Sequence, residues 1–164
     1  MRKRKLLLTT VVALILVAVA AGWYWFRPDL LFVNHQVSEA LPQSAENAPA
    51  ILATGEFHTV NHQSKGTATI YRLANGKRAL RFTDFETSEG PALYVYLVAA
   101  PDATDSKTVS EAKTLDLGDL KGNMGDQNYD LPADADLSVF HSVTIWCKRF
   151  SVNFATAPLA RQGS

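Results

Sequence analysis

The 164-residue chain contains a single cysteine, Cys147, and this scarcity limits what its sulfur can do. One thiol cannot close a disulfide within the chain. If the domain that carries it faces an oxidising compartment, Cys147 is buried and inert, paired with another molecule, bound to a cofactor, or chemically active. The function of the protein therefore depends on which of these four states the thiol adopts.

Basic residues are scarce after the first 27 positions. Residues 28–164 contain 11 Lys and Arg residues but all 16 Asp and Glu residues of the chain. The chain as a whole is neutral, but this larger part carries a formal charge of −5. A nucleic-acid interface requires clustered Lys and Arg with interleaved aromatic residues, and no such cluster occurs there. The composition thus argues against nucleic acid as a partner.

Charge is absent from residues 6–26, LLLTTVVALILVAVAAGWYWF. At about 1.5 Å per residue, a helix of this length covers the roughly 30 Å hydrocarbon core of a bilayer. The basic tail at residues 1–5 predicts a cytoplasmic N-terminus by the positive-inside rule. We expect a single-pass transmembrane signal anchor at 6–26, with the lipid bilayer as its partner and a periplasmic or extracellular domain after it.

The alternative is a cleaved signal peptide, for which Ala18 and Ala20 supply the small residues of a cleavage site. The apolar run is longer than an ordinary signal core, however, and Trp23, Tyr24 and Trp25 are typical of an aromatic belt at the outer membrane interface. Both interpretations export the remainder of the chain.

Proline and small polar residues dominate residues 27–50. We expect a flexible linker there, with brief structure at most in the pieces LLFV and VSEAL. Residues 51–160 are richer in apolar stretches and have the size of one domain. The sequence therefore predicts one extracytoplasmic domain on a tether.

The apolar pattern of residues 51–160 alternates every second residue and lacks a long helical stripe. Segments 66–73 and 78–82 alternate around Asn75-Gly76, a pair that favours a tight hairpin turn, and Leu93, Val95 and Leu97 share one face. Residues 102–114 are predicted to form an exposed polar loop with at most one helical turn. We expect strands near 52–60, 67–73, 78–84, 92–99, 114–117, 127–131 and 141–155. The predicted fold class is all-β, an antiparallel, immunoglobulin-like β-sandwich.

The strand around the cysteine, SVTIWCKRFSV at residues 142–152, changes its apolar parity. We expect either a change from two covered faces to one, or a β-bulge at residues 147–149, and bulges are frequent near active sites. On a regular strand Arg149 shares the face of Cys147 and favours its thiolate. A small buried cysteine without chemical function is the alternative.

His58 and His62 have a spacing that, on a helix, would bring two imidazoles together to bind one metal ion. Their segment lacks a helical pattern, however. In a strand, four residues separate them by ~13 Å, so we expect no shared metal site, although one of them can still supply a single contact in a cleft. The Gly- and Asp-rich residues 115–132 fit neither a calcium loop nor a phosphate loop. They are expected to form a tightly turned structural loop in which glycines permit a close backbone approach.

Several motifs occur in one order along the chain: GEFH from Gly55, HQSKGTA from His62, LRFTDF from Leu80, GPALYVYL from Gly90, LGDLKGNMGDQNY from Leu117, Pro132, and VTIWCKRFSV from Val143. Together they cover residues 51–159 and resemble the DM thirteen domain, which is found in Skeletor-type proteins and beside DOMON domains. The resemblance implies a small extracytoplasmic β-sandwich related in shape to DOMON domains. It also implies the electron-transfer role proposed for this family around the cysteine of a Trp-Cys pair.

Here that pair is Trp146-Cys147, so Cys147 is the predicted redox residue. Its thiol would either cycle through sulfenate and mixed disulfide or ligate a haem or a metal, while the cofactor itself and the redox partner or envelope protein stay unknown. For a cofactor, the candidate binding residues are Trp146, Cys147, Tyr94, Tyr129 and His58.

The alternative is a noncatalytic β-sandwich that binds a ligand or protein of the cell envelope, with a buried structural cysteine. A hydrolase is disfavoured because no Ser, His and acid combination has a recognisable local context. The sequence thus favours an electron-transfer or binding domain over a stand-alone enzyme.

Overall fold

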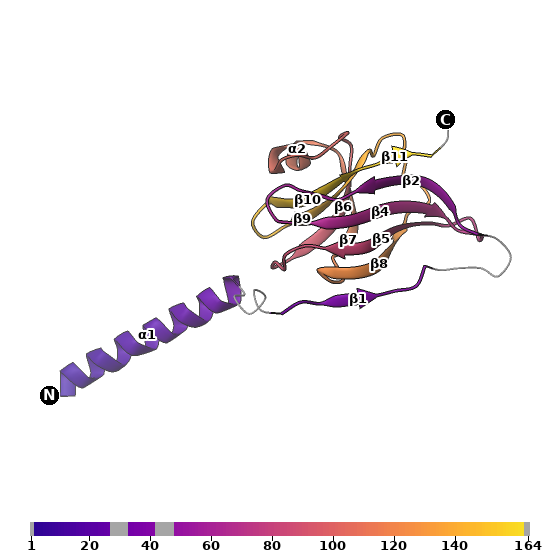
Figure 1. Cartoon of the computed structure of the whole chain (residues 1–164). Helices are drawn as coiled ribbons and strands as arrows, with labels where there is room; N and C mark the ends of the chain where they lie inside the picture. The colour runs from indigo at the N-terminus through magenta and orange to yellow at the C-terminus, as the bar shows by residue number, and fades with distance from the viewer. Residues whose placement is uncertain (1, 27–32, 42–47, 163–164) are drawn as a thin grey trace. The chain divides into compact units, whose positions relative to one another are not determined.

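The computed structural model describes residues 2–26, 33–41 and 48–162 of the chain. The chain divides into two compact units, with the division between Val33 and Asn34. In the first unit, the described residues form one helix, α1 (Arg2–Phe26), and in the second they form a short helix and all of the described strands (Figure 1).

None of the described residues of α1 is buried, although most of them are apolar. The helix is long and apolar enough to cross a membrane. A signal sequence near an N-terminus has the same length and composition. The predicted apolar helix is therefore confirmed, and it can serve as a single-pass anchor or as a signal peptide.

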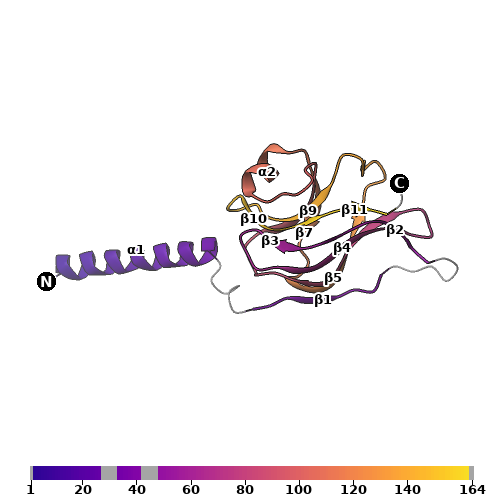
Figure 2. The same ribbon diagram turned by 45° about the horizontal axis from the view of Figure 1, so that its top comes forward.

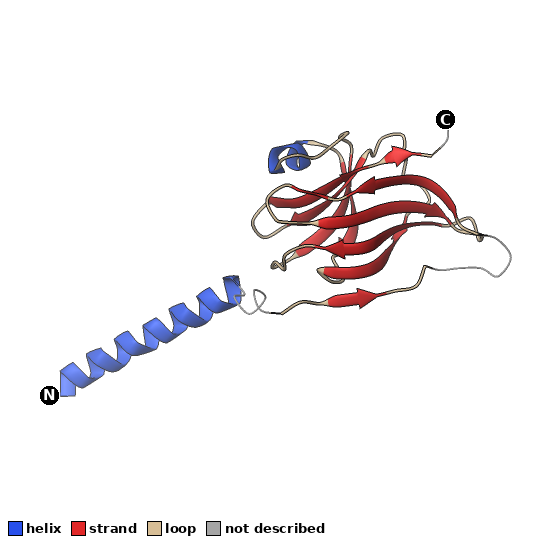
Figure 3. Ribbon diagram, viewed as in Figure 1, coloured by secondary structure: helices blue, strands red, loops and turns tan. Residues whose placement is uncertain are grey.

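Two β-sheets make up most of the second unit (Figure 3). Their strand orders are β1-β8-β5-β4-β2-β11 and β3-β10-β9-β6-β7. The strands are β1 (Gln36–Ser38), β2 (Ala50–Glu56), β3 (His58–Thr59), β4 (Lys65–Arg72), β5 (Arg78–Glu86), β6 (Leu93–Val98), β7 (Thr114–Asp119), β8 (Met124–Leu131), β9 (Ser142–Cys147), β10 (Val152–Pro158) and β11 (Ala160–Arg161). Described neighbours pair antiparallel except β1 and β8, which are parallel. The predicted antiparallel β-sandwich is confirmed.

Alternate residues of the two sheets build the core between them. Leu93, Val95 and Leu97 of β6 are at most 6% exposed and belong to one buried cluster with Leu80 and Phe82 of β5. Burying side chains of this size contributes about 1.5–3 kcal/mol each. The predicted alternation is confirmed in both strands, and so is the hairpin that joins β4 and β5 through Gly76, whose φ is +79°.

Helix α2 (Ser106–Glu111) forms within residues 102–114, where we predicted an exposed loop (Figure 2). The Asp105 side chain caps the helix by accepting a hydrogen bond from the Thr108 backbone N–H at 2.6 Å. Val109 is 3% exposed and packs against Val98 and Trp146 in a second, smaller apolar cluster. The loop thus covers part of the second sheet instead of being wholly exposed.

The predicted strand at 141–155 is in fact two strands, β9 and β10, joined by a turn at Lys148–Ser151. Ser151 has a φ of +52°, as a tight turn requires, and Phe150 is 43% exposed. Phe150 made the apolar pattern look continuous, which is why the prediction of a single strand, with either a change from two covered faces to one or a bulge at 147–149, was wrong. The register shift in this hairpin lies farther on, between Asn153 and Ala155.

The described residues 34–41 lie within the predicted flexible linker, yet they pack against the domain, and we call them the strap. Their strand β1 pairs with β8 over Gln36–Met124 to Ser38–Asp126, which agrees with brief structure in VSEAL and corrects the expectation of a linker here. Close approach is possible because Gly125 has no side chain and adopts a φ of +94°. Elsewhere in the predicted linker, residues 33, 48 and 49 lie in no helix or strand, Ala50 begins β2, and residues 27–32 and 42–47 lie outside the described residues.

We expect Gly125→Ala to displace the strap, because a Cβ atom there would lie 2.0 Å from the Val37 carbonyl oxygen. Gly76→Ala is the matched control, since Gly76 also has a positive φ but has no atom within 4 Å of such a Cβ. The control should lose about 1–2 kcal/mol from backbone strain alone, and Gly125→Ala at least about 1 kcal/mol more. Urea unfolding of the full chain in detergent, followed by near-ultraviolet circular dichroism, measures both losses. Equal losses would contradict the docking of the strap.

Candidate functional site

Cys147 ends strand β9 and is fully buried. Its neighbours across the sheet are Leu93 on β6 and Val152 on β10, and its side chain belongs to the main core cluster. The Sγ–H group donates a hydrogen bond to the Pro91 carbonyl oxygen at 3.1 Å. The thiol is therefore sealed from solvent in the closed fold, with one polar contact to the backbone.

The segment between β5 and β6 contacts this thiol through the Pro91 carbonyl, and we call residues 87–92 the cover. One end is fixed by a hydrogen bond from the Thr87 N–H to the Asn123 carbonyl at 2.9 Å, and the other by one from the Lys148 N–H to the Ala92 carbonyl at 3.0 Å. Between them Pro91 is only half-buried, and Ala92 is exposed with a φ of +63°, a conformation that strains a non-glycine residue. The sulfur is thus in direct contact with a strained segment at the surface.

Trp146 precedes Cys147 and therefore points to the opposite face of the sheet. It is 7% exposed and packs with Val98, Ala103 and Val109 in the smaller cluster beneath α2. Tyr94 is its direct cross-strand neighbour. Sequence reasoning placed Trp146 and the thiol in one site, and strand alternation separates them.

Tyr94 lies on the Trp146 face and is covered by Lys148. The Lys148 Nζ lies 3.4 Å from the centroid of the Tyr94 ring and 2.8 Å from Asp116 Oδ2. A hydrogen bond with the Asp119 carboxylate raises the pKa of the Tyr94 phenol, and the bond to Asp116 raises the pKa of Lys148. The ring face is thus occupied by a cation, and Tyr94 does not offer it to a flat cofactor.

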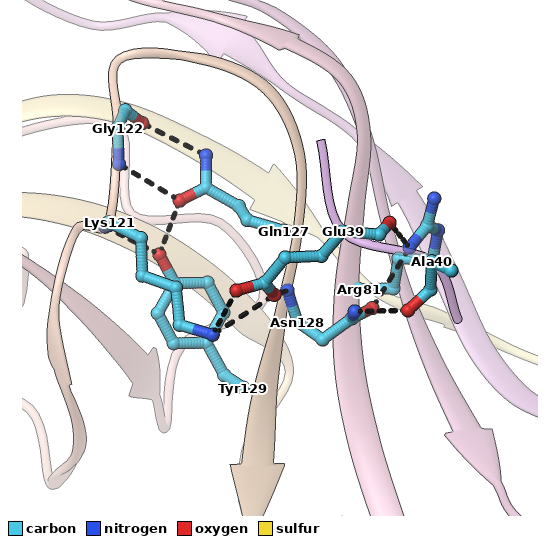
Figure 4. A network of polar contacts seen from close by, with 8 residues as sticks. All are labelled: Glu39, Ala40, Arg81, Lys121, Gly122, Gln127, Asn128 and Tyr129. Carbon is cyan, nitrogen blue, oxygen red and sulfur yellow. Dashed lines mark hydrogen bonds and ion pairs between the residues drawn. The ribbon is translucent and has the colours of Figure 1, made fainter. Parts of the chain in front are cut away.

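Tyr129 belongs to the first sheet and lies in a polar network at its edge (Figure 4). Its hydroxyl donates to Gln127 Oε1 at 2.7 Å and accepts from the Lys121 N–H at 3.2 Å. The side chain is 4% exposed, and burial raises the pKa of the phenol above its ordinary value. The hydrogen bonds and burial of Tyr129 therefore explain its position near the edge of the first sheet.

His58 and His62 have separate partners. The His58 Nε2 lies 2.9 and 3.0 Å from the two carboxylate oxygens of Asp102, whereas the His62 ring stacks on Phe154 with centroids 3.7 Å apart. Among the described residues, no three His, Cys, Asp or Glu side chains gather as a metal site requires. His58 thus forms an ion pair or hydrogen bond at the edge strand β3, which is separated by β10 from β9, the strand that carries Cys147.

Arg149 lies in the turn after β9, so the strand argument that placed it on the face of Cys147 does not hold. The predicted cofactor residues are likewise not all brought together, since Trp146 and Tyr94 are cross-strand neighbours on one face of the sheet and Cys147 faces the core on the other. A haem held by the thiol would have to displace core residues. The residues as folded therefore do not fit a haem on Cys147.

Sequence reasoning missed two residues, Pro91, whose carbonyl accepts the thiol hydrogen bond, and Asn123, which fixes the first residue of the cover. The Pro91 contact is made by a backbone carbonyl, which has no signature in a sequence. Asn123 stands in the GNMG stretch, which was interpreted as a turn. It is 2% exposed, and the signal that the sequence offers for it is an amide side chain between two glycines.

These features define an all-β domain of two packed sheets that buries one cysteine and follows an apolar helix. A family model described as "Electron transfer DM13" matches residues 56–159, more than half of the chain, and the chain belongs to this family. The resemblance to the DM thirteen domain is thereby confirmed. No curated protein and no solved structure matches the chain.

His62 predicts a pH dependence of stability in this region. Burial lowers the pKa of His62 below its ordinary 6.5, so the folded state binds fewer protons than the unfolded state just below that pH. The stability that depends on a neutral His62 is fully present above the pKa of the unfolded state. It is lost as the pH falls from about 6.5 toward the lower pKa of the folded state. We expect His62→Phe, which keeps a ring on Phe154, to flatten the change in unfolding free energy between pH 7.5 and 5.5. An unchanged pH profile in urea titrations would contradict the assignment.

Proposed function

We propose that the chain is a membrane-anchored, extracytoplasmic electron-transfer module with Cys147 as its redox-active group. Membership of the electron-transfer family and the apolar helix support this proposal. The basic tail before the helix supports a cytoplasmic N-terminus. The family motif carries the thiol at its Trp-Cys pair, although the tryptophan packs on the other face of the sheet.

The observation that carries the proposal is the contact between the Cys147 Sγ and the Pro91 carbonyl of the cover, at 3.1 Å. Local openings of a surface segment cost less free energy than global unfolding. Displacing the cover would expose the sulfur while the two sheets stay paired. Cys147 is therefore a protected thiol that reacts when the cover opens.

The chemistry that fits one thiol is a two-electron cycle with external partners. A peroxide oxidises the Cys147 thiolate: the S–O bond forms, the O–O bond breaks, and the leaving oxygen departs as water after protonation, which leaves a sulfenic acid. Because the chain has no second cysteine, a thiol of another molecule must resolve it, releasing water and forming a mixed disulfide. A second external thiol then attacks this disulfide and returns Cys147 to its reduced state.

The second candidate is a noncatalytic binding module in which Cys147 only packs. Its complete burial and its place in the core cluster favour this alternative. Free cysteine commonly plays such a role as a small apolar residue. The two candidates differ in whether the folded protein lets an oxidant reach the sulfur.

We expect the full chain in detergent, treated with hydrogen peroxide below the onset of unfolding, to form a sulfenic acid at Cys147 that a dimedone-type reagent traps and a dithiol reverses. Mass spectrometry of the labelled peptide measures it, and Cys147→Ser should abolish it. Cys147→Ala should lower the unfolding free energy by about 1–2 kcal/mol, an effect that both candidates share. Trapping only after denaturation would leave the packing role alone.

For the anchor, we expect the chain to stay with membranes after alkaline carbonate extraction, and protease added outside intact cells or spheroplasts to digest the β-domain. A positively charged N-terminal flank and an apolar span predict this orientation. Release of a shortened, soluble domain would instead identify α1 as a cleaved signal peptide.

A further inference from the structure

We propose that the strap, residues 34–41, is a latch that holds the cover closed over Cys147. This inference rests on the proposed function, because it assigns the control of access to the same thiol. Within it, His35, Glu89 and Asn123 are positioning residues that act on the sulfur through the cover. The strap is also the stretch of chain that follows the apolar helix in sequence.

The far end of the strap is clamped through Glu39 (Figure 4). Its carboxylate accepts hydrogen bonds from the Lys121 Nζ at 2.8 and 3.0 Å and from the Asn128 N–H at 2.7 Å, while Arg81 Nη1 donates to its backbone carbonyl at 2.9 Å. Partial burial raises the pKa of Glu39, but the bonds from Lys121 and Asn128 outweigh it and hold the pKa below its usual value. Polar contacts of both side chain and backbone thus recognise this residue.

The near end of the strap meets the cover at Asn123. Its Oδ1 accepts from the His35 N–H at 2.8 Å, and its Nδ2 donates to the Thr87 carbonyl at 3.0 Å and to Asn34 Oδ1 at 3.0 Å. The Thr87 N–H in turn donates to the Asn123 carbonyl. One buried side chain therefore joins the strap to the first residue of the cover.

A second link joins the strap to the middle of the cover. The His35 Nδ1 lies 2.8 Å from Glu89 Oε1, and the Glu89 side chain is only 12% exposed. Removing His35 would leave this carboxylate with little solvent and without that partner, which costs free energy. Glu89 stands two residues before Pro91, whose carbonyl receives the thiol hydrogen bond. Hydrogen bonds therefore connect the strap to the cover and the cover to the sulfur.

The strap is suited to opening because polar contacts, and little apolar burial, hold it. In β1 only Val37 is half-buried, and Gln36 and Ser38 are exposed. The net contribution of a single hydrogen bond is about 0.5–1.5 kcal/mol, so a short parallel edge strand fixed in this way can release while the core stays folded. The latch and the core thus open at different free energies.

The test is the rate at which a maleimide labels Cys147 in the full chain in detergent, under conditions that keep it folded. His35→Ala and Glu89→Gln should each raise this rate by about tenfold, the factor expected for losing a hydrogen bond to a charged group. His35→Gln, which can still donate to Glu89, should restore most of the protection. Lys65→Ala is the matched control, since it breaks an exposed ion pair with Glu86 in the same sheet, at 2.6 Å, and should leave the rate unchanged.

Two further measurements separate a latch from general destabilisation. Urea unfolding should show that His35→Ala lowers the global free energy of unfolding by less than the free energy that corresponds to its change in labelling rate. The double variant His35→Ala/Glu89→Gln should label no faster than either single variant. If Cys147 of the folded protein labels at the same rate in the wild type and in both single variants, the latch is overturned and the redox proposal stands. Faster labelling without reversible oxidation by peroxide would support the latch and overturn the redox proposal.

Discussion

Alternation of side chains along β6 and β9 decides where every residue near the cysteine lies. It turns Cys147 toward the core, beside Leu93, and turns Trp146 toward α2, beside Tyr94. Two adjacent residues that form one motif in the sequence thereby belong to two different apolar clusters. A shift of one residue in the β9 register would exchange them, placing the sulfur beneath α2 and moving the large indole into the core. The burial of both inner faces is what prevents that shift.

The same domain contacts its thiol with the short segment between β5 and β6. The cover is attached to the fold by backbone hydrogen bonds at Thr87 and Ala92, and Ala92 adopts a strained conformation. Asn123 connects this segment to the strap, and the strap is anchored at its other end by Glu39. A buried cysteine and a reactive cysteine are therefore compatible in one structure, provided that the cover opens more easily than the sheets separate. In this account, access to the sulfur is controlled by residues that never touch it.

Much of the fold follows from local patterns, because alternation and turn chemistry act over a few residues. Leu80, Phe82 and the Asn75-Gly76 turn were predictable for that reason, as was the apolar helix. Phe150 led to a wrong strand prediction because an apolar residue in an exposed turn mimics the continuation of a strand. The strap was not predictable, since its polar residues resemble a linker and its docking depends on Gly125, far away in the sequence. The candidate site failed to appear as a cluster because the sequence shows neither which face a side chain takes nor that a backbone carbonyl is the partner of the thiol.

The central claim is that Cys147 exchanges electrons while the two sheets stay packed. The most direct measurement is to equilibrate the full chain in glutathione buffers of graded redox poise and to follow the mixed disulfide at Cys147 by mass, together with the near-ultraviolet circular dichroism of the same samples. The account predicts a reversible midpoint with the tertiary signal retained throughout. A mixed disulfide that forms only as the tertiary signal disappears would contradict it, and the cysteine would then be a packing residue.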